Sequence, residues 1–504
     1  MTNRLCNPLA LVSVWTGLCL VAAGARAAED WTSFRGPQGL GTAEASNLPV
    51  KWDADTNVVW KQDLPGLGSS SPIVLGSRVF LTCYSGYGES IEQPGDKSRL
   101  MRHVVCLDRD TGKIVWTKPF RGKSSESDYR PGNDSRHGYA SSTIATDGEH
   151  LFVFFGISGV FCLDLEGKVL WNTDVGSGTH GWGSGTSPVL YQDLAIVNAS
   201  IESTSLIALD KTTGKEVWRV PGIAKCWSSP MLVDVDGGQE LVLNTPNKIM
   251  GFDPATGQQL WYCEGIPDSY VCPSVISHEG VVYAIGGRKN TAIAVRAGGR
   301  GDVTGSHVLW KTGSGSNVSS PVYLDGFLYW FHESRGIVNC LNATTGESVY
   351  QERLDPRPGL VYSSVTAADG KLYAISQEDG TFVLAAKPEF ELLAVNVFED
   401  DRTRSNASII VSNNQLLLRT DKALYCLGLP GSGQLAGLQS GDFLPAEGGF
   451  RTWTDATGRH QVEAVFLSIE ADRVKLRKRD GSVILVPVNR LSRADQGWIA
   501  ARER

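Results

Sequence analysis

A hairpin motif that recurs along the chain constrains the fold more than any other feature. In residues 209–218, LDKTTGKEVW, Asp210 can accept backbone hydrogen bonds across a turn, and Gly214 supplies the positive φ that closes it. Trp218 then anchors the following strand. The tryptophans that serve as such repeat anchors are Trp60, Trp116, Trp171, Trp218, Trp261 and Trp310. From Trp116 onward they are spaced by 43 to 55 residues, a period that predicts a β-propeller.

The inner strand of each repeat begins with a sequence similar to Ser-Ser-Pro. The eight starts lie at residues 70–72, 141–143, 186–188, 228–230, 271–273, 319–321, 363–365 and 407–409. The last repeat, 406–429, lacks an outer strand, whereas residues 57–61 form an outer strand with no inner strands before it. If residues 57–61 pair with the last repeat, no open sheet edge is left between the N-terminal and C-terminal ends of the propeller. The sequence therefore predicts an all-β fold whose residues 28–429 form an eight-bladed β-propeller with N-to-C strand closure.

The two ends of the chain differ from the repeats. Residues 1–27 have a short polar start, an apolar run over about 9–23 and small residues at 25–27, which is typical of a cleaved signal peptide. A retained anchor is the alternative, but about fifteen apolar residues are short for a membrane span. We therefore expect export to the periplasm or the extracellular space, with no transmembrane span in the mature chain.

The C-terminal part has its own composition. Residues 430–449 are rich in Gly, Pro, Ser and Leu and read as a linker, and 450–504 show short alternating strands typical of a small barrel. This tail carries eleven Lys and Arg against seven acids, a net charge of +4, so the remainder carries −11 of the total −7. The tail is therefore expected to be a separate unit whose net charge is opposite in sign to that of the rest of the chain. The overall negative charge argues against a nucleic-acid partner.

Seven of the eight cysteines beyond the signal peptide fall into two groups. Cys106, Cys162, Cys340 and Cys426 occupy the same slot of their repeats, so they are expected to be small buried hydrophobic residues rather than a disulfide framework. Cys226, Cys263 and Cys272 lie near repeat ends, where one pair could bridge.

No constellation in the sequence requires catalysis or a metal. The histidines lack metal-ligand spacing, and there is no haem attachment site, nucleophile elbow or phosphate loop. Residues 234–240, DVDGGQE, resemble part of a calcium loop but fall where a hairpin turn is needed, so a turn is the preferred interpretation. The tripeptide Arg300-Gly301-Asp302 lies on a hairpin tip, where turn chemistry explains it.

The best candidate site is defined by position. Residues just before the inner strands should form the rim of the central channel. The candidates there are Tyr139, Trp182, Trp227, Tyr270, Tyr362, Asn406, His137, His180 and Lys225. Aromatic and polar groups around a concave mouth suit a flat ring or a sugar. The alternative is that these rings pack against each other and fill the channel. Two polar insertions, 84–99 and 121–137, are either recognition loops or tolerated surface insertions.

These motifs resemble known families. The hairpins and Ser-Ser-Pro starts, over about residues 31–429, are similar to repeats of pyrroloquinoline-quinone (PQQ) enzymes and of the non-enzymatic outer-membrane-protein assembly lipoprotein. Residues 34–37, FRGP, and 298–303, GGRGDV, resemble an exported bacterial PQQ-like subfamily. The quinone enzymes imply an adjacent cysteine pair and calcium carboxylates, and no two cysteines are adjacent here. The tail, through Trp453-Thr454-Asp455, Gly458, 462–464, 486–487 and 491–492, is similar to the first Sla-type homology domain, an SH3-like fold that implies protein or peptide binding.

The sequence thus predicts an exported, non-catalytic recognition scaffold that is monomeric and needs no cofactor. The propeller would bind protein or glycan, and the barrel would bind protein or peptide, with envelope or extracellular partners. The alternative is a PQQ- and calcium-dependent alcohol or sugar dehydrogenase.

Overall fold

The computed structural model describes residues 30–90, 92–129, 137–432, 451–455, 461–470, 473–478 and 483–500. The chain divides into two compact units between Gln434 and Leu435. The predicted signal peptide, 1–27, and nearly all of the predicted linker, 430–449, lie outside the described residues. No helix among the described residues is long and apolar enough to cross a membrane.

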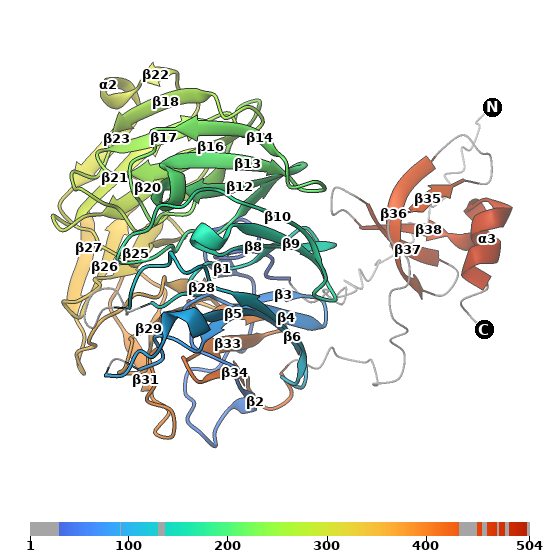
Figure 1. Cartoon of the computed structure of the whole chain (residues 1–504), viewed down its shortest axis with the longest axis horizontal. Helices are drawn as coiled ribbons and strands as arrows, with labels where there is room; N and C mark the ends of the chain where they lie inside the picture. Colours follow the sequence, from blue (N-terminus) through green and yellow to red (C-terminus); the bar gives the residue numbers. More distant parts are fainter. Residues whose placement is uncertain are drawn as a thin grey trace, which may run out of the picture. The chain divides into compact units, whose positions relative to one another are not determined.

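The first unit is a β-propeller of small antiparallel sheets that follow one another along the chain (Figure 1). In the described part of this unit, the eight sheets contain β3 (Ile73–Leu75), β4 (Arg78–Ser85), β5 (Met101–Asp108) and β6 (Ile114–Arg121); β7 (Ala145–Thr146), β8 (His150–Phe154), β9 (Val160–Asp164) and β10 (Val169–Thr173); β11 (Val189–Tyr191), β12 (Leu194–Ala199), β13 (Ser205–Asp210) and β14 (Glu216–Pro221); β15 (Met231–Val235), β16 (Gly238–Thr245), β17 (Lys248–Phe252) and β18 (Gln259–Glu264); β19 (Ile276–His278), β20 (Val281–Gly286), β21 (Thr291–Arg296) and β23 (Val308–Thr312); β24 (Val322–Leu324), β25 (Phe327–Phe331), β26 (Ile337–Asn342) and β27 (Ser348–Arg353); β28 (Thr366–Ala368), β29 (Lys371–Ile375), β30 (Thr381–Ala385) and β31 (Leu392–Asn396); and β32 (Ile410–Ser412), β33 (Gln415–Arg419), β34 (Ala423–Leu427) and β2 (Val58–Asp63).

Short elements decorate these sheets. They are the edge strands β1 (Thr42–Ala43) and β22 (Gly301–Asp302), the single helical turns α1 (Ser200–Ser203) and α2 (Thr304–His307), and the 3-10 turns η1 (Lys97–Arg99) and η2 (Gly156–Ser158).

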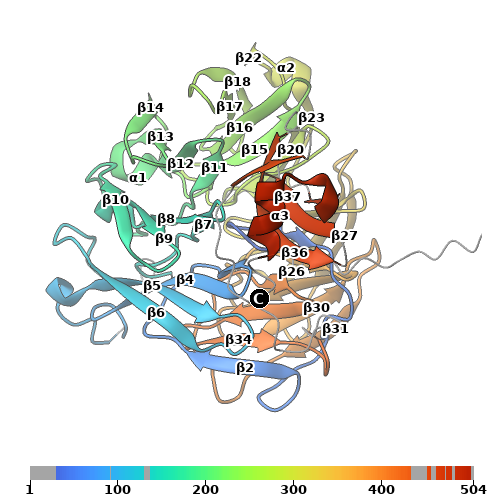
Figure 2. The same ribbon diagram turned by 90° about the vertical axis from the view of Figure 1, so that its right-hand side faces the viewer.

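Strands from both ends of the unit meet in one sheet. Strand β2 pairs antiparallel with β34, with Trp60 opposite Cys426 and Lys61 opposite Tyr425. Figures 1 and 2 both show the blue β2 beside the orange β34. The orphan outer strand expected at 57–61 therefore supplies the fourth strand of the last sheet.

One hydroxyl residue at or next to each inner-strand start joins neighbouring sheets. It is the middle residue of the start in six repeats, the third residue of 141–143 in the second repeat, and Ser274, directly after 271–273, in the fifth. Its backbone N–H donates to the hydroxyl of the equivalent residue in the next sheet. The donor–acceptor pairs are Ser71 to Thr143 (3.0 Å), Thr143 to Ser187 (3.0 Å), Ser187 to Ser229 (2.9 Å), Ser229 to Ser274 (2.9 Å), Ser274 to Ser320 (3.1 Å), Ser320 to Ser364 (3.3 Å), Ser364 to Ser408 (3.0 Å) and Ser408 to Ser71 (3.1 Å). These eight bonds, which we call the hydroxyl ring, satisfy buried backbone donors that no strand could reach.

The anchor tryptophans also join sheets. The indole of Trp171 donates to the carbonyl oxygen of Lys211 in the next hairpin turn, at 2.8 Å. It lies against Gly214 of that turn, where an added Cβ would come within 2.5 Å of the ring. The same indole–glycine contact joins Trp60 to Gly112, Trp116 to Gly167, Trp218 to Gly257 and Trp310 to Gly346. The turn glycine is thus required both for its positive φ and for the neighbouring ring.

Trp261 is an exception among the anchors. Its indole donates to the carboxylate of Glu240 in its own sheet, at 2.6 Å, and the buried Glu240 also pairs with Arg300 at 3.0 Å. This ion pair holds the long hairpin tip, so that β22 pairs parallel with β18. The Arg300-Gly301-Asp302 tripeptide is therefore part of a sheet edge. Residues 234–240 form the β15–β16 hairpin, as the turn interpretation predicted.

The eight cysteines among the described residues are free thiols. Cys106, Cys162, Cys340 and Cys426 are fully buried, which confirms the packing role that their repeat slot predicted. Cys226, Cys263 and Cys272 are also free, so no pair among these three forms a bridge.

The second unit is an SH3-like domain whose described residues form one four-stranded sheet. Its elements are β35 (Arg451–Thr454), β36 (Gln461–Glu470), β37 (Arg473–Lys478), β38 (Val483–Pro487), the 3-10 turn η3 (Val488–Arg490) and helix α3 (Arg493–Ala500), which packs on the strands (Figure 2). Trp453 is buried in its core with Leu476 and Ile499. The buried carboxylate of Asp495 accepts hydrogen bonds from the Thr454 amide (2.9 Å) and the Ser492 hydroxyl (2.8 Å), which ties α3 to the first strand.

Candidate functional site

Four of the predicted rim residues form one cluster of rings. His180, Trp182, Trp227 and Tyr270 meet with centroid separations of 4.7 to 6.3 Å and with interplanar angles of 53° to 87°. Such tilted and edge-to-face contacts are the favoured geometry of aromatic pairs. We call these four residues the ring cluster. They come from the loops that precede β11, β15 and β19, as the positional argument predicted.

Hydrogen bonds and one cation fix the ring cluster. The Trp227 indole donates to the Gly183 carbonyl at 2.8 Å, and the Asn317 amide donates to the Tyr270 hydroxyl at 2.7 Å. The Arg288 guanidinium lies 5.2 Å from the Tyr270 ring. Trp227 is 9% exposed, whereas Trp182 and Tyr270 are half-buried. His180 is also half-buried, so the cluster is a fixed surface with three partly accessible rings.

The opposite part of the rim is polar. The Gln377 amide donates to Asn406 (2.7 Å), Asn406 donates to Ser69 (3.2 Å), and Ser69 donates to the carbonyl of His137 (2.8 Å). Burial lowers the pKa of His137 to about 4, so this imidazole is neutral at physiological pH. Its Nδ1 lies 2.6 Å from the Ser141 hydroxyl. This chain of contacts links the last two sheets to the first two.

The remaining candidates lie elsewhere on the rim. Lys225 is exposed, and Tyr362 is half-buried just before its inner strand. The structure thus brings His180, Trp182, Trp227 and Tyr270 together in the ring cluster, and it places Asn406 and His137 in the polar part of the rim.

Tyr139 belongs to a second aromatic group. It contacts Tyr84 (5.5 Å) and Tyr87 (5.8 Å), and Tyr87 contacts Tyr129 (6.3 Å). Tyr84, Tyr87 and Tyr129 come from the two polar insertions, which therefore pack against one another in their described parts. A buried ion pair between Arg102 and Glu126, at 2.6 Å, fastens the second insertion to its sheet.

Glu202 is a titratable residue of this region that the sequence reasoning missed. It lies in α1, is 4% exposed, and accepts a hydrogen bond from the Ser184 hydroxyl in the loop that carries Trp182. Its other carboxylate oxygen has no hydrogen-bond partner among the described residues. Burial raises the pKa of Glu202 to about 7, although the Ser184 hydrogen bond opposes this rise. The available signal was that Glu202 is the only charged residue in the stretch 194–209.

Glu202 should make stability depend on pH. Its pKa is raised in the folded state from 4.5 to about 7, so folding favours the protonated form. The free energy of unfolding should therefore be highest below about pH 4.5 and fall as pH rises to about 7. Urea unfolding of the wild type and Glu202→Gln at about pH 5 and about pH 8 tests this, because the amide mimics the neutral acid and should remove the decrease. An equal pH dependence in both proteins, with the exposed Glu347→Gln as the control, would contradict it.

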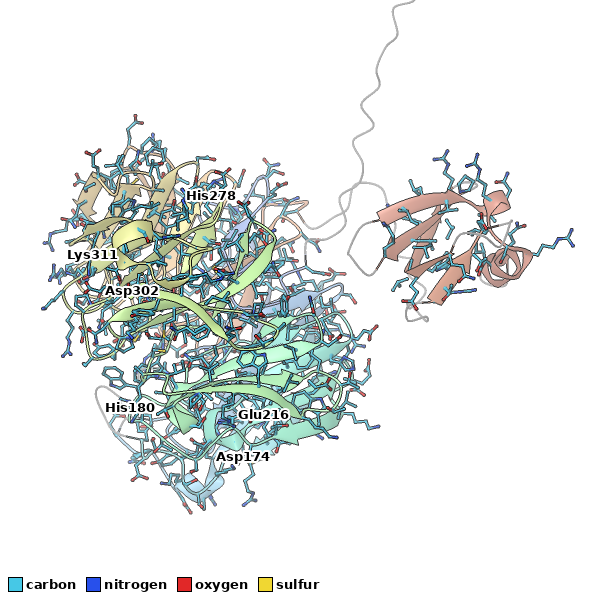
Figure 3. All side chains as sticks on the ribbon, turned by 90° about the horizontal axis from the view of Figure 1, so that it is seen from above. Asp174, His180, Glu216, His278, Asp302 and Lys311 are labelled. Atoms are coloured by element: carbon cyan, nitrogen blue, oxygen red, sulfur yellow. The ribbon has the colours of Figure 1, made fainter. Side chains whose placement is uncertain are left out.

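A cleft at the other end of the inner strands was also missed. It has a volume of about 1240 Å³ and lies between residues 32–40 and the strands β11, β15 and β19. The ring cluster precedes these strands, whereas the turns at Gln192, Asp236 and Glu279 follow them and border the cleft. Figure 3 shows His180 of the ring cluster and His278 of the cleft well apart. The sequence feature that pointed to this cleft was the FRGP motif before the first strand, because Phe34, Arg35 and Pro37 of that motif line the cleft.

Sequence comparison defines the class of protein: a PQQ-like repeat propeller carrying a second small domain. The model of the family described as outer membrane protein assembly factor BamB matches residues 101–352, half of the chain. The chain therefore belongs to this family. Residues 443–504 match the SLA1 homology domain 1 model. None of the curated proteins is similar enough to match the chain.

Solved structures share the fold at low sequence identity. BamB from Moraxella catarrhalis is 13% identical with a TM-score of 0.50, covering 74% of this chain and 99% of that chain. A europium-containing methanol dehydrogenase is 11% identical with a TM-score of 0.58, covering 80% and 98%. Sqt1 of Saccharomyces cerevisiae is 12% identical with a TM-score of 0.52, covering 75% and 100%. At these identities the likeness shows the fold alone.

The resemblance to the quinone enzymes implies an adjacent cysteine pair and a set of calcium carboxylates. No two cysteines are adjacent in the sequence, and the described residues contain no group of three or more His, Cys, Asp or Glu side chains that could hold a metal ion.

Proposed function

We propose that this chain is an exported, non-catalytic recognition protein. Its propeller binds protein or glycan at the ring cluster, and its barrel binds protein or peptide. The observation that carries the proposal is the ring cluster itself, since it offers three half-buried rings on an otherwise fixed surface. A preformed aromatic surface loses little conformational entropy when a ligand binds, and its faces suit sugar rings and apolar side chains.

We further propose that the eight sheets act as the blades of one closed ring, which keeps the loops of the ring cluster in place. The hydroxyl ring and the β2–β34 pairing support this closure. The barrel would be joined to the propeller by the linker 430–449, so that binding at one unit raises the effective concentration of the other.

A capture experiment tests the proposal. Full-length protein, a Trp182→Ala/Tyr270→Ala variant and a Tyr262→Ala variant are used to capture ligands from envelope extracts and from a glycan array. Trp227 is left intact because it is buried, and its loss would destabilise the fold by about 3–5 kcal/mol. The double variant should lose most captured species while its melting temperature stays close to that of the wild type.

Tyr262 is a matched control, because it is a half-buried tyrosine on the outer strand β18, away from the rim. The Tyr262→Ala variant should capture like the wild type. A chain that lacks residues 435–504 assigns each captured species to one unit. Unchanged capture by a folded double variant would exclude the ring cluster as the binding surface.

The alternative function, a quinone-dependent dehydrogenase, receives support from the fold alone. We propose instead that no cofactor is needed. Titration of the protein with PQQ and Ca²⁺ should produce no new visible absorbance and no reduction of an artificial electron acceptor. Saturable quinone uptake together with turnover would replace the recognition proposal by an enzymatic one.

A further inference from the structure

The N-terminal segment, residues 30–43, already covers part of the channel at the cleft end. The backbone groups of Trp31 and Val74 exchange two hydrogen bonds of 2.9 Å, and the amide of Thr146 donates to the carbonyl of Thr32. Farther along, β1 pairs parallel with the inner strand β28, and the amide of Ala367 donates to the carbonyl of Gly41. The segment thus satisfies inner-strand backbone groups of the sheets that begin with β3, β7 and β28.

The guanidinium of Arg35 extends this coverage. It donates to the carbonyls of Leu40 (2.9 Å) and Pro321 (2.5 Å), which lie in the segment and just before β24. Among the inner strands that the segment does not pair with are β11, β15 and β19. Each stands at the end of its sheet, so one edge of each has no strand partner within the described residues. These three strands line the cleft of about 1240 Å³.

The unpaired edge of β15 presents defined backbone groups. Val235 and Gly238 close the two-residue hairpin between β15 and β16, so they form a hydrogen-bonded pair. Because bonded and non-bonded pairs alternate, the N–H and C=O groups of Leu232 and Asp234 face away from β16. Both residues line the cleft. An extended chain placed there could take up these hydrogen bonds, as the N-terminal segment does elsewhere in the channel.

We infer that the cleft binds an extended peptide, which pairs with the free edge of β15. The chain's own N-terminal segment shows that inner-strand edges of this channel accept extended backbone. Leu40 and Phe34 of that segment, with Met231 and Leu232 of β15, supply apolar surface for alternate side chains of the peptide.

The charges at the cleft specify the peptide further. The charged groups along it are Arg35, Asp147, Lys211, Asp234, Asp236, Glu279 and Arg296. Lys211 and Asp147 neutralise each other in an ion pair of 3.2 Å, and Arg35 is buried against backbone carbonyls. The exposed charged groups that remain are three carboxylates, Asp234, Asp236 and Glu279, and one arginine, Arg296, so negative charge prevails at this end of the cleft. The peptide should therefore carry lysine or arginine at this end.

This site is independent of the proposed recognition at the ring cluster, because the two lie at opposite ends of the same inner strands. Failure of one proposal leaves the other standing. The test is a selection of short random peptides displayed against the full-length protein, followed by affinity measurement for the enriched sequences. Enriched peptides should contain Lys or Arg and should bind the Trp182→Ala/Tyr270→Ala variant as tightly as the wild type.

Backbone pairing is tested from both sides. Leu232→Pro removes an N–H donor on the free edge while leaving the β15–β16 ladder, so affinity should fall by about tenfold or more. If that variant does not fold, two versions of each peptide are compared on the wild-type protein, one N-methylated at the odd residues and one at the even residues. The affinity of one of these two registers should fall by a similar factor. Equal affinity for both N-methylated registers would overturn the inference.

Charge recognition has its own control. Asp234→Asn/Glu279→Gln should weaken binding and reduce its dependence on salt, whereas Glu347→Gln, on an exposed turn of another sheet, should change neither. Absence of any enriched peptide, or enriched peptides that bind a folded Leu232→Pro variant normally, would overturn the inference.

Discussion

Deleting residues 28–62 should lower the free energy of unfolding of the propeller by about 6 kcal/mol or more. The deletion removes four buried side chains, Trp31, Leu48, Trp52 and Trp60, which pack in one core with β34 and the inner strands. Each such side chain contributes about 1.5–3 kcal/mol through burial. Since a domain has only about 5–15 kcal/mol in total, the shortened protein should lose its cooperative unfolding transition.

The deletion also leaves β34 as an open edge, which favours aggregation. Chemical denaturation followed by tryptophan fluorescence, together with light scattering, measures both effects. Removal of residues 435–504 is the control, because it deletes a separate compact unit and should leave the transition of the propeller intact. A cooperative transition near the wild-type midpoint after deletion of 28–62 would show that β2 does not support the ring.

Gly214→Ala should have the second largest effect. Gly214 has a φ of +69°, and an added Cβ would come within 2.5 Å of the Trp171 ring. The left-handed backbone costs an alanine about 1–2 kcal/mol, and the overpacking against the indole adds about 1–3 kcal/mol. Urea unfolding should therefore show a loss of about 2–5 kcal/mol.

Gly222, at the other end of β14, is the matched control for this substitution. Its φ is +79°, and an added Cβ would meet no atom within 4 Å. Gly222→Ala should therefore lose only the backbone contribution of about 1–2 kcal/mol. Equal losses at the two glycines would show that the contact with Trp171 has no energetic role.

The sequence by itself determined the local units of this protein. Hairpins such as 209–218 depend on neighbouring residues, because the turn carboxylate, the glycine and the strand tryptophan act within ten positions. The period of these hairpins then indicated a propeller, and the spare strand around Trp60 indicated its place beside the last repeat. The rim candidates were predicted only as a ring of positions, since side-chain contacts between loops of different repeats leave no trace in local spacing.

Only the tertiary structure decided which of those positions meet and what joins the sheets. The hydroxyl ring links residues that lie more than forty positions apart, so no local pattern reveals its bonds. The ring cluster separates His180, Trp182, Trp227 and Tyr270 from Tyr139, because the two insertions hold Tyr139 among their own tyrosines. The cleft arises from the path of residues 30–43 across the channel, and that path depends on backbone pairing with distant strands.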